Sequence, residues 1–302
     1  MTKGKTPKIS VIMSIYNQMN EDQLDSAIFS VLNQTFGDFE FIIYDDGSDK
    51  TVKARLQDYA KLDNRIVLIS NPVNHGLAYS LNTCIDVAKG KYMARMDADD
   101  ICAPNRFEVQ YKYLEKHPEI AFVGCNAWLI DDHGTWGCRQ MPKDPTKQSF
   151  LRYSPYIHPT VMIRRAIFAK TDGYKVSKGT WRCEDYELFM RLLKLGHRGH
   201  NIQQNLFYYR EDANAYKKRK MKYRIDEMKL RYRGFKELDM LNAKGWLYVV
   251  RPLVAGCVPS FMILGTKRIH SKWTENHEKQ VERKTELVQS ALEKRADAVT
   301  RV

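Results

Sequence analysis

Residues 39–51 read FEFIIYDDGSDKT, an apolar run that ends abruptly in two aspartates, a glycine and a serine. Such a run, closed by turn residues, is typical of a strand buried on both faces of a sheet. Similar runs lie at Ile9–Ile15 and Tyr92–Met96. The second of these ends in Asp97-Ala98-Asp99-Asp100, so two strands are followed directly by acidic clusters.

Segments with helical spacing of apolar residues separate these runs, at 22–31, 51–62 and 78–88, and a further strand is expected at 66–69. Strands that alternate with helices predict an α/β fold with a mostly parallel, Rossmann-like central sheet flanked by helices. Ligands of such sheets bind beyond the carboxyl ends of the strands. Both acidic clusters are expected at that edge.

The composition of the chain indicates what kind of partner and which cellular compartment to expect. The chain has 302 residues and a net charge of +13, which favours an anionic partner such as a phosphorylated substrate, an acidic membrane face or nucleic acid. Six scattered cysteines form no CxxC pair and read as reduced, buried thiols. No apolar segment follows the first lysines, so no cleaved signal peptide is expected. These features predict a protein on the cytosolic side of the membrane.

The pair Asp97 and Asp99 could hold a divalent cation, because alternate strand residues point to one side and hard cations prefer oxygen ligands. The alternative is a solvated acidic turn. Asp45 and Asp46 allow two readings as well: ordinary turn chemistry, or carboxylates that accept hydrogen bonds from a base or a ribose.

The second half of the chain reads as a mixture of helices and strands. A helix is expected at 105–116 and strands at 120–129 and 159–163. Glu184-Asp185 opens a helix, where carboxylates either cap free N–H groups or serve as a general base toward a hydroxyl. His158 could supply an imidazole to the site or be a buried structural histidine.

Several stretches together resemble the family-2 glycosyltransferases with the GT-A fold. The matching stretches are ISVIMSIYN (9–17), SVLNQTFGDFEFIIYDDGSDKT (30–51), NHGLAYSLNTCIDVAKGKYMARMDADDI (74–101), HPTVMIRR (158–165) and EDYELFMRL (184–192). Their order and spacing carry the resemblance over residues 8–212, and the tail lies outside it.

The resemblance implies a nucleotide-sugar site and a metal site. The residues expected to bind the nucleotide sugar are Ser14, Ile15, Tyr16, Asn17, Asp45, Asp46, Asn74, Arg95, Asp97, Ala98 and Asp99. Asp97 and Asp99 match the metal-binding DxD motif for Mn²⁺ or Mg²⁺, with His158 as a further candidate ligand. The donor is expected to be a UDP-sugar, with a dTDP-sugar as the alternative.

By the same resemblance the reaction is an inverting, in-line displacement. Asp185, beside Glu184, matches the catalytic base that deprotonates an acceptor hydroxyl. Members that build bacterial surface polysaccharides often use lipid-linked acceptors, so a lipid-linked or oligosaccharide acceptor is expected. The organisation is then a GT-A catalytic domain at 1–212, with a nucleotide-sugar half at about 8–103 and an acceptor half at 104–212.

The remaining chain predicts a helical, membrane-associating extension. Residues 210–233 hold ten Lys or Arg against four acids, and residues 246–266 are apolar but interrupted by Arg251, Pro252 and Pro259. An interfacial hairpin at an anionic, cytoplasmic membrane face fits this pattern better than a spanning helix, although a buried helical hairpin is the alternative. Residues 213–273 form this region. Residues 274–302 predict a charged amphipathic helix that would allow a homodimer.

Two other functions compete with this interpretation. A nucleotidyltransferase-like or catalytically inactive nucleotide-binding protein would share the sheet and the acids, but no Gly- and Lys-rich phosphate loop follows the first strand. A nucleic-acid-binding protein would leave the acidic clusters unexplained, because they repel phosphate. No nucleic-acid partner is therefore expected.

Overall fold

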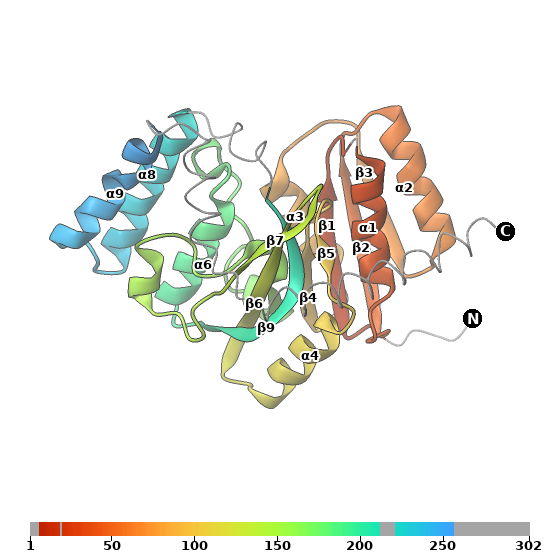
Figure 1. Cartoon of the computed structure of the whole chain (residues 1–302), viewed down its shortest axis with the longest axis horizontal. Coiled ribbons are helices and arrows are strands. Elements are labelled where there is room, and N and C mark those ends of the chain that lie inside the picture. The colour runs from red at the N-terminus through yellow and green to blue at the C-terminus, as the bar shows by residue number, and fades with distance from the viewer. Residues whose placement is uncertain (1–5, 19, 212–220, 257–302) are drawn as a thin grey trace.

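The computed structural model describes residues 6–18, 20–211 and 221–256, where nine strands form one sheet (Figure 1). The strands are β1 (Ile9–Ile15), β2 (Phe39–Asp46), β3 (Ile66–Asn71), β4 (Tyr92–Met96), β5 (Ile101–Cys102), β6 (Ile120–Asp131), β7 (Gly134–Arg139), β8 (Met162–Arg164) and β9 (Arg198–Arg210). The α-helices are α1 (Glu21–Leu32), α2 (Lys50–Leu62), α3 (Leu77–Val87), α4 (Arg106–Lys116), α5 (Arg165–Phe168), α6 (Glu184–Lys194), α8 (Met221–Glu237) and α9 (Ala243–Gly256). Short 3-10 helices are η1 (Lys147–Phe150), η2 (His158–Thr160) and η3 (Lys178–Thr180).

The sheet is mixed. Its strand order is β3-β2-β1-β4-β8-β6-β9-β5, and β7 pairs with β6. The pairs among β1 to β4 and the pair β6–β9 are parallel, whereas β8 runs antiparallel to both β4 and β6. The prediction of an α/β sheet flanked by helices is confirmed, but the prediction of a mostly parallel sheet was wrong. Parallel pairing occurs where helices connect the strands, among β1 to β4 and again at β6–β9, whereas the tight β6–β7 connection requires an antiparallel hairpin.

Both faces of the sheet are buried, as continuous apolar strands require. Alternate residues of β1 enter two different clusters: Val11 and Met13 pack with α1, α2 and α4, while Ile12 packs with α3 and α6. The helices predicted at 22–31 and 51–62 are α1 and α2. They begin after Asn20 and Asp49, whose side chains accept hydrogen bonds from backbone N–H groups of the first turn.

The strand predicted at 159–163 begins later than expected. His158–Thr160 form the 3-10 helix η2, and β8 starts at Met162. Pro159 is the physical reason, because proline has no N–H for a ladder hydrogen bond and fits the first turn of a helix. The long strand β9 was not predicted at all.

The C-terminal part of the described chain is an antiparallel helix pair, α8 and α9, at the end of the molecule farthest from α2 (Figure 1). None of the described helices is long and apolar enough to cross a membrane. The second half of the predicted apolar hairpin, 257–266, and the predicted amphipathic helix at 274–302 lie outside the described residues. The domain boundaries stay predictions.

A buried arginine attaches α8 to the catalytic half. The Arg231 side chain is 2% exposed and donates hydrogen bonds to the carbonyl oxygens of Leu151, at 2.7 Å, and Arg152, at 3.2 Å. It also pairs with Glu227 at 2.9 Å and lies over the ring of Tyr186 in α6. Part of the basic stripe at 210–233 is therefore structural and does not face a partner.

We expect Arg231→Met to destabilise the protein by about 3 kcal/mol, because it removes the donor of two backbone carbonyl groups and the closer of the two arginines that pair with Glu227. Lys229→Met is the matched control, since Lys229 is exposed on the same helix and its replacement should change stability by less than about 0.5 kcal/mol. Urea denaturation measures both values. Equal stability of the two variants would show that α8 does not depend on the Arg231 contacts.

Candidate functional site

The loops after β1 and β2 leave the same edge of the sheet and are tied together. Ile15 lies opposite Asp45 in the β1–β2 ladder. The backbone N–H of Asn17 donates to Ser48 Oγ at 3.0 Å, and Asn17 Oδ1 accepts from the N–H of Asp49 at 2.9 Å. Asn17 has a left-handed φ of +46°, which asparagine tolerates. Ser14, Ile15 and this tied loop form one wall of the candidate site.

Asp45 and Asp46 are both buried, with different partners. Asp45 Oδ1 accepts from the N–H of Ser48 at 2.9 Å, while its Oδ2 has Lys53 Nζ at 3.8 Å. Asp46 accepts from the N–H groups of His75, at 2.9 Å, and Gly76, at 2.8 Å. Asp46 therefore fixes the loop that carries Asn74 to the end of β2.

Gly47 permits this arrangement. Its φ is +81°, and a Cβ there would lie 2.8 Å from the backbone N of Asn74. The loop at 73–74 therefore approaches the β2 turn more closely than any side chain would allow. Asn74 itself is exposed, as is Tyr16 on the opposite loop. Both side chains are free to meet a ligand.

The acids after β4 form a compact cluster. Oxygens of Asp97, Asp99 and Asp100 lie within 4.8 Å of one another, the arrangement expected of a cation site. Asp100 was not predicted as a site residue. It is 1% exposed, and its Oδ2 has no hydrogen-bond partner. A buried oxygen without a partner, beside two other carboxylates, fits a bound Mn²⁺ or Mg²⁺.

Burial of this cluster opposes its ionisation. Burial first, and then the charge of Asp97, raise the pKa of Asp99 to about 6, while Arg210 and Arg95 oppose the shift. Burial and the two neighbouring acids raise the pKa of Asp100 well above its usual value. A divalent cation would relieve this repulsion. The donor set and its electrostatics therefore suit a metal ion.

Strand β9 supports the cluster from a distant part of the sequence. The N–H of Arg210 donates to Asp100 Oδ1 at 2.7 Å, and Arg210 Nε donates to the carbonyl oxygen of Asp99 at 2.9 Å. The Gln18 amide lies 3.5 Å from the carbonyl oxygen of Ala98 and links the loop after β1 to the same turn. The backbone of the DxD turn is thus held from two sides.

His158 stands beside the cluster but has a partner of its own. Its Nε2 lies 2.7 Å from the hydroxyl of Tyr174, and burial, followed by the charge of Arg95, lowers its pKa well below the usual value. The group of clustered acidic side chains in the described residues does not contain His158. Its assignment as a metal ligand stays a prediction. Tyr174 was missed, because no local motif marks it.

Glu184 and Asp185 open α6 as predicted. Glu184 is 9% exposed, and burial and then the charge of Asp185 raise its pKa to about 7. Burial also raises the pKa of Asp185, against backbone hydrogen bonding and the charge of Arg95. Both carboxylates at this helix start therefore have raised pKa values, as expected of groups that accept a proton.

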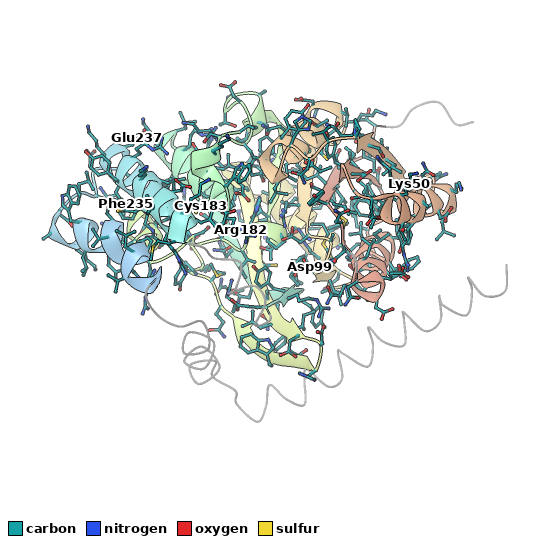
Figure 2. The ribbon with its side chains drawn as sticks, turned by 90° about the horizontal axis from the view of Figure 1, so that it is seen from above. Lys50, Asp99, Arg182, Cys183, Phe235 and Glu237 are labelled. Atoms are coloured by element: carbon teal, nitrogen blue, oxygen red, sulfur yellow. The ribbon has the colours of Figure 1, made fainter. Side chains whose placement is uncertain are left out.

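Arg95 joins the two groups of acids. Its side chain is 4% exposed and pairs with Asp97 through Nη1 and Oδ2. Its charge also lowers the pKa values of Asp99, Glu184 and Asp185. Asp99 at the end of the sheet and Cys183, the residue before α6, occupy the middle of the molecule, between the α2 end and the α8–α9 end (Figure 2). The structure thus brings together acids that the sequence separates by more than eighty residues.

The sequence is similar to those of known glycosyltransferases. Residues 10–239 match the model of glycosyl transferase family 2. The chain is 37% identical over 271 residues to the glycosyltransferase named EpsE of Bacillus subtilis, which covers 89% of this chain and 95% of EpsE. It is 29% identical over 237 residues to the Escherichia coli UDP-Gal:alpha-D-GlcNAc-diphosphoundecaprenol beta-1,3-galactosyltransferase, over 76% of this chain and 84% of that enzyme.

A solved structure shows the same fold. The mannosyltransferase PcManGT from Pyrobaculum calidifontis, in complex with GDP-Man and Mn²⁺, superposes with a TM-score of 0.60 at 14% identity, over 95% of this chain and 86% of that chain. The fold is therefore GT-A-like, as the resemblance implied. Since the family model also covers most of the sequence, the chain belongs to glycosyl transferase family 2.

Proposed function

We propose that the protein is an inverting, metal-dependent glycosyltransferase that moves a sugar from a nucleotide-diphosphate sugar to a hydroxyl of a lipid-linked glycan in surface-polysaccharide synthesis. One observation carries the proposal. Buried Arg95 pairs with Asp97 of the acidic cluster after β4, and its charge also acts on the carboxylates that open α6. A site for a leaving diphosphate and a base for an incoming hydroxyl thus lie side by side.

The donor binds at the carboxyl edge of β1, β2 and β4. Asp45, Asp46 and the loops at 14–17 and 73–76 face the nucleoside, and Arg95 contacts the diphosphate. Asp97 and Asp99, with Asp100, hold Mn²⁺ or Mg²⁺. When bound to these residues, a divalent cation would supply charge stabilisation to the departing nucleotide diphosphate. A UDP-sugar is favoured, since the similar galactosyltransferase is named for UDP-Gal, and a dTDP-sugar is the alternative.

Asp185 acts as the base. Its carboxylate takes the proton of the acceptor hydroxyl as that oxygen attacks the anomeric carbon, and the bond from that carbon to the diphosphate oxygen breaks on the opposite face. A single displacement inverts the configuration. Glu184 shares the site and keeps a second carboxyl group next to the base. Arg95 holds both groups near a fixed positive charge, which limits the cost of ionising them in a buried position.

The acceptor is proposed to be lipid-linked. The E. coli relative is named for a diphosphoundecaprenol acceptor. In this chain α9 exposes an apolar face formed by Trp246, Leu247, Val250 and Val254. These positions lie within one helical stripe, with Lys244 and Arg251 at its border. We propose that the protein rests peripherally on the cytoplasmic face of the plasma membrane through this stripe.

The rival functions are less well supported. A nucleotidyltransferase has no use for a base at the start of α6, and the family match argues against that class. A catalytically inactive relative would retain the fold but has no need for the buried carboxylates Glu184 and Asp185, whose raised pKa values lower stability at neutral pH. A measurement of sugar transfer by the protein distinguishes an active enzyme from an inactive relative.

We expect Asp185→Asn to lower kcat by about 10²- to 10⁴-fold, because the amide cannot accept the proton. Donor binding should persist, so a thermal-shift titration with UDP and Mn²⁺ should give the wild-type stabilisation. Asp99→Asn is the comparison variant and should lose the Mn²⁺-dependent part of that shift. Unchanged turnover in Asp185→Asn would remove Asp185 from the mechanism.

Activity should fall as the pH falls through the pKa of Asp185, because only the carboxylate form accepts a proton. Burial raises this pKa, so the acid limb of kcat/KM should lie above the ordinary aspartate value of about 3.9. The Glu184→Gln variant tests the assignment. The limb should persist in it, and its disappearance would identify Glu184 as the base.

The double variant Leu247→Glu/Val254→Glu should weaken binding to phosphatidylglycerol vesicles by roughly a hundredfold, since two apolar side chains no longer enter the interface. Leu62→Glu is the control, because Leu62 is equally exposed at the end of α2, away from the helix pair. Vesicle co-sedimentation of the full chain measures both. Equal sedimentation of the double variant and the wild type would exclude the α9 face as the membrane contact.

A further inference from the structure

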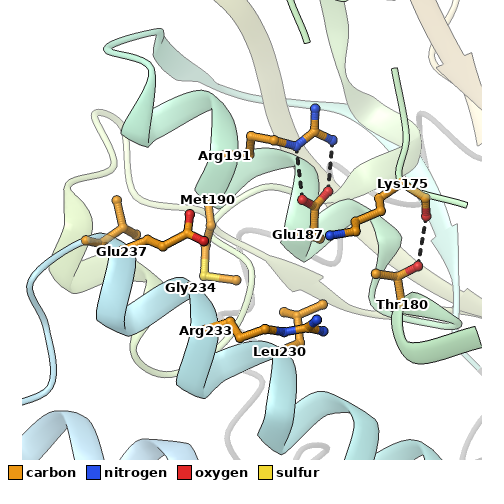
Figure 3. A pocket seen from close by; sticks show the side chains of 10 residues that line it. Lys175, Thr180, Glu187, Met190, Arg191, Leu230, Arg233, Gly234 and Glu237 are labelled. Atoms are coloured by element: carbon orange, nitrogen blue, oxygen red, sulfur yellow. Dashed lines mark hydrogen bonds and ion pairs between the residues drawn. The ribbon is translucent and has the colours of Figure 1, made fainter. Parts of the chain in front are cut away.

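A pocket of about 180 Å³ lies between α6, α8 and the loop at 173–180 (Figure 3). Met190 of α6 and Leu230 of α8 give it an apolar wall. Lys175 enters it from the loop and Arg233 from α8. The site described above does not include any of these residues.

Among the described residues, the acidic side chains around this pocket have ion-pair partners, whereas two of its basic side chains do not. Glu187 pairs with Arg191 at 2.9 Å, and Glu237 pairs with Lys194 at 3.0 Å. The side chains of Lys175 and Arg233 have no hydrogen-bond or ion-pair partner within the part of the chain that the structure describes. The acids of the pocket are therefore neutralised, and two positive charges remain for a ligand.

The backbone around the pocket is held in place. Thr180 is 1% exposed, and its hydroxyl donates to the carbonyl oxygen of Lys175 at 2.8 Å, which closes the loop on itself. On the other side, a Cβ on Gly234 would lie 2.5 Å from Met190 Sδ, so α8 approaches α6 closely there because residue 234 is glycine. The backbone segments that carry Lys175 and Arg233 are thus both held in place.

The pocket lies along α6, the helix that begins with Glu184 and the proposed base Asp185. Glu184, Glu187 and Arg191 follow one another at three- and four-residue intervals and share one face of α6. At 1.5 Å per residue, Glu187 lies only about 4.5 Å along the helix axis from Glu184. Lys175 directly follows Tyr174, whose hydroxyl contacts His158 in the catalytic half. The pocket is therefore one helical turn from Glu184, the carboxyl group next to the proposed base.

We propose that this pocket binds the diphosphate group of the lipid-linked acceptor, with Lys175 and Arg233 contacting its phosphate oxygens. This inference rests on the proposed function. An arginine fork and a lysine point charge are the usual recognition of phosphate oxygens. The lipid chain would continue along the α8–α9 pair, whose exposed apolar stripe is on α9. Donor and acceptor diphosphates thus occupy separate sites.

The test is isothermal titration of the full chain with dodecyl diphosphate, inorganic pyrophosphate and UDP, in EDTA so that no metal ion contributes. Lys175→Ala/Arg233→Ala should weaken dodecyl diphosphate and pyrophosphate at least about tenfold, the loss expected for one charged hydrogen bond or more. UDP affinity should not change. Lys236→Ala, an exposed cation on α8 outside the pocket, is the matched control and should bind like the wild type.

Lys175→Arg/Arg233→Lys retains both charges and should retain most of the binding, which excludes a folding defect as the cause of the loss. Equal affinity of the alanine variant and the wild type for dodecyl diphosphate would overturn the inference. A matching loss of UDP affinity would overturn it too, by assigning the pocket to the donor. Because no titration requires turnover, an inactive enzyme would refute the proposed function and leave this result intact.

Discussion

The site depends on one buried positive charge. Arg95 sits at the end of β4 with 4% of its side chain exposed, pairs with Asp97, and lowers the pKa values of acids on both sides of it. A buried guanidinium without such partners would cost several kcal/mol, and so would buried carboxylates without a cation. The buried arginine and the buried carboxylates therefore stabilise one another. The charge of Arg95 thus acts both on the acids after β4 and on the two carboxylates that open α6.

The positive charge of Arg95 compensates only part of the negative charge of the acids around it. One arginine cannot neutralise Asp97, Asp99, Asp100, Glu184 and Asp185 together, so burial leaves the last four with raised pKa values. In the proposed function, the excess negative charge after β4 would bind a divalent cation, and the excess at α6 would bind a proton. In that proposal Asp185 would be the principal acceptor for a proton from the second substrate once the nucleotide diphosphate is bound.

Much of the fold could be predicted because β1, β2 and β4 are buried on both faces and read as continuous apolar runs. Strand β9 could not be, since RGHNIQQNLFYYR alternates irregularly and pairs with β6 over several register shifts. The same limit applies to the site. Asp97 and Asp99 stand in a local motif, but the role of Asp100 depends on the N–H of Arg210, 110 residues later, and that of Tyr174 on His158. Contacts of that kind leave no pattern in a single sequence.

The helix pair at the C-terminal end shows why a charge count alone misleads. The count of basic residues at 210–233 predicted a membrane-associating region, yet Arg231 is buried against the chain after η1 and against α6, whereas Arg233, two residues on, lines a pocket. Two residues turn an α-helix by about 200°, so neighbouring arginines face opposite surroundings. One basic residue therefore fastens α8 to the catalytic half, and the next is left for an anionic ligand. Helix α8 is therefore both a structural support of the catalytic half, through Arg231, and one wall of the pocket that Arg233 enters.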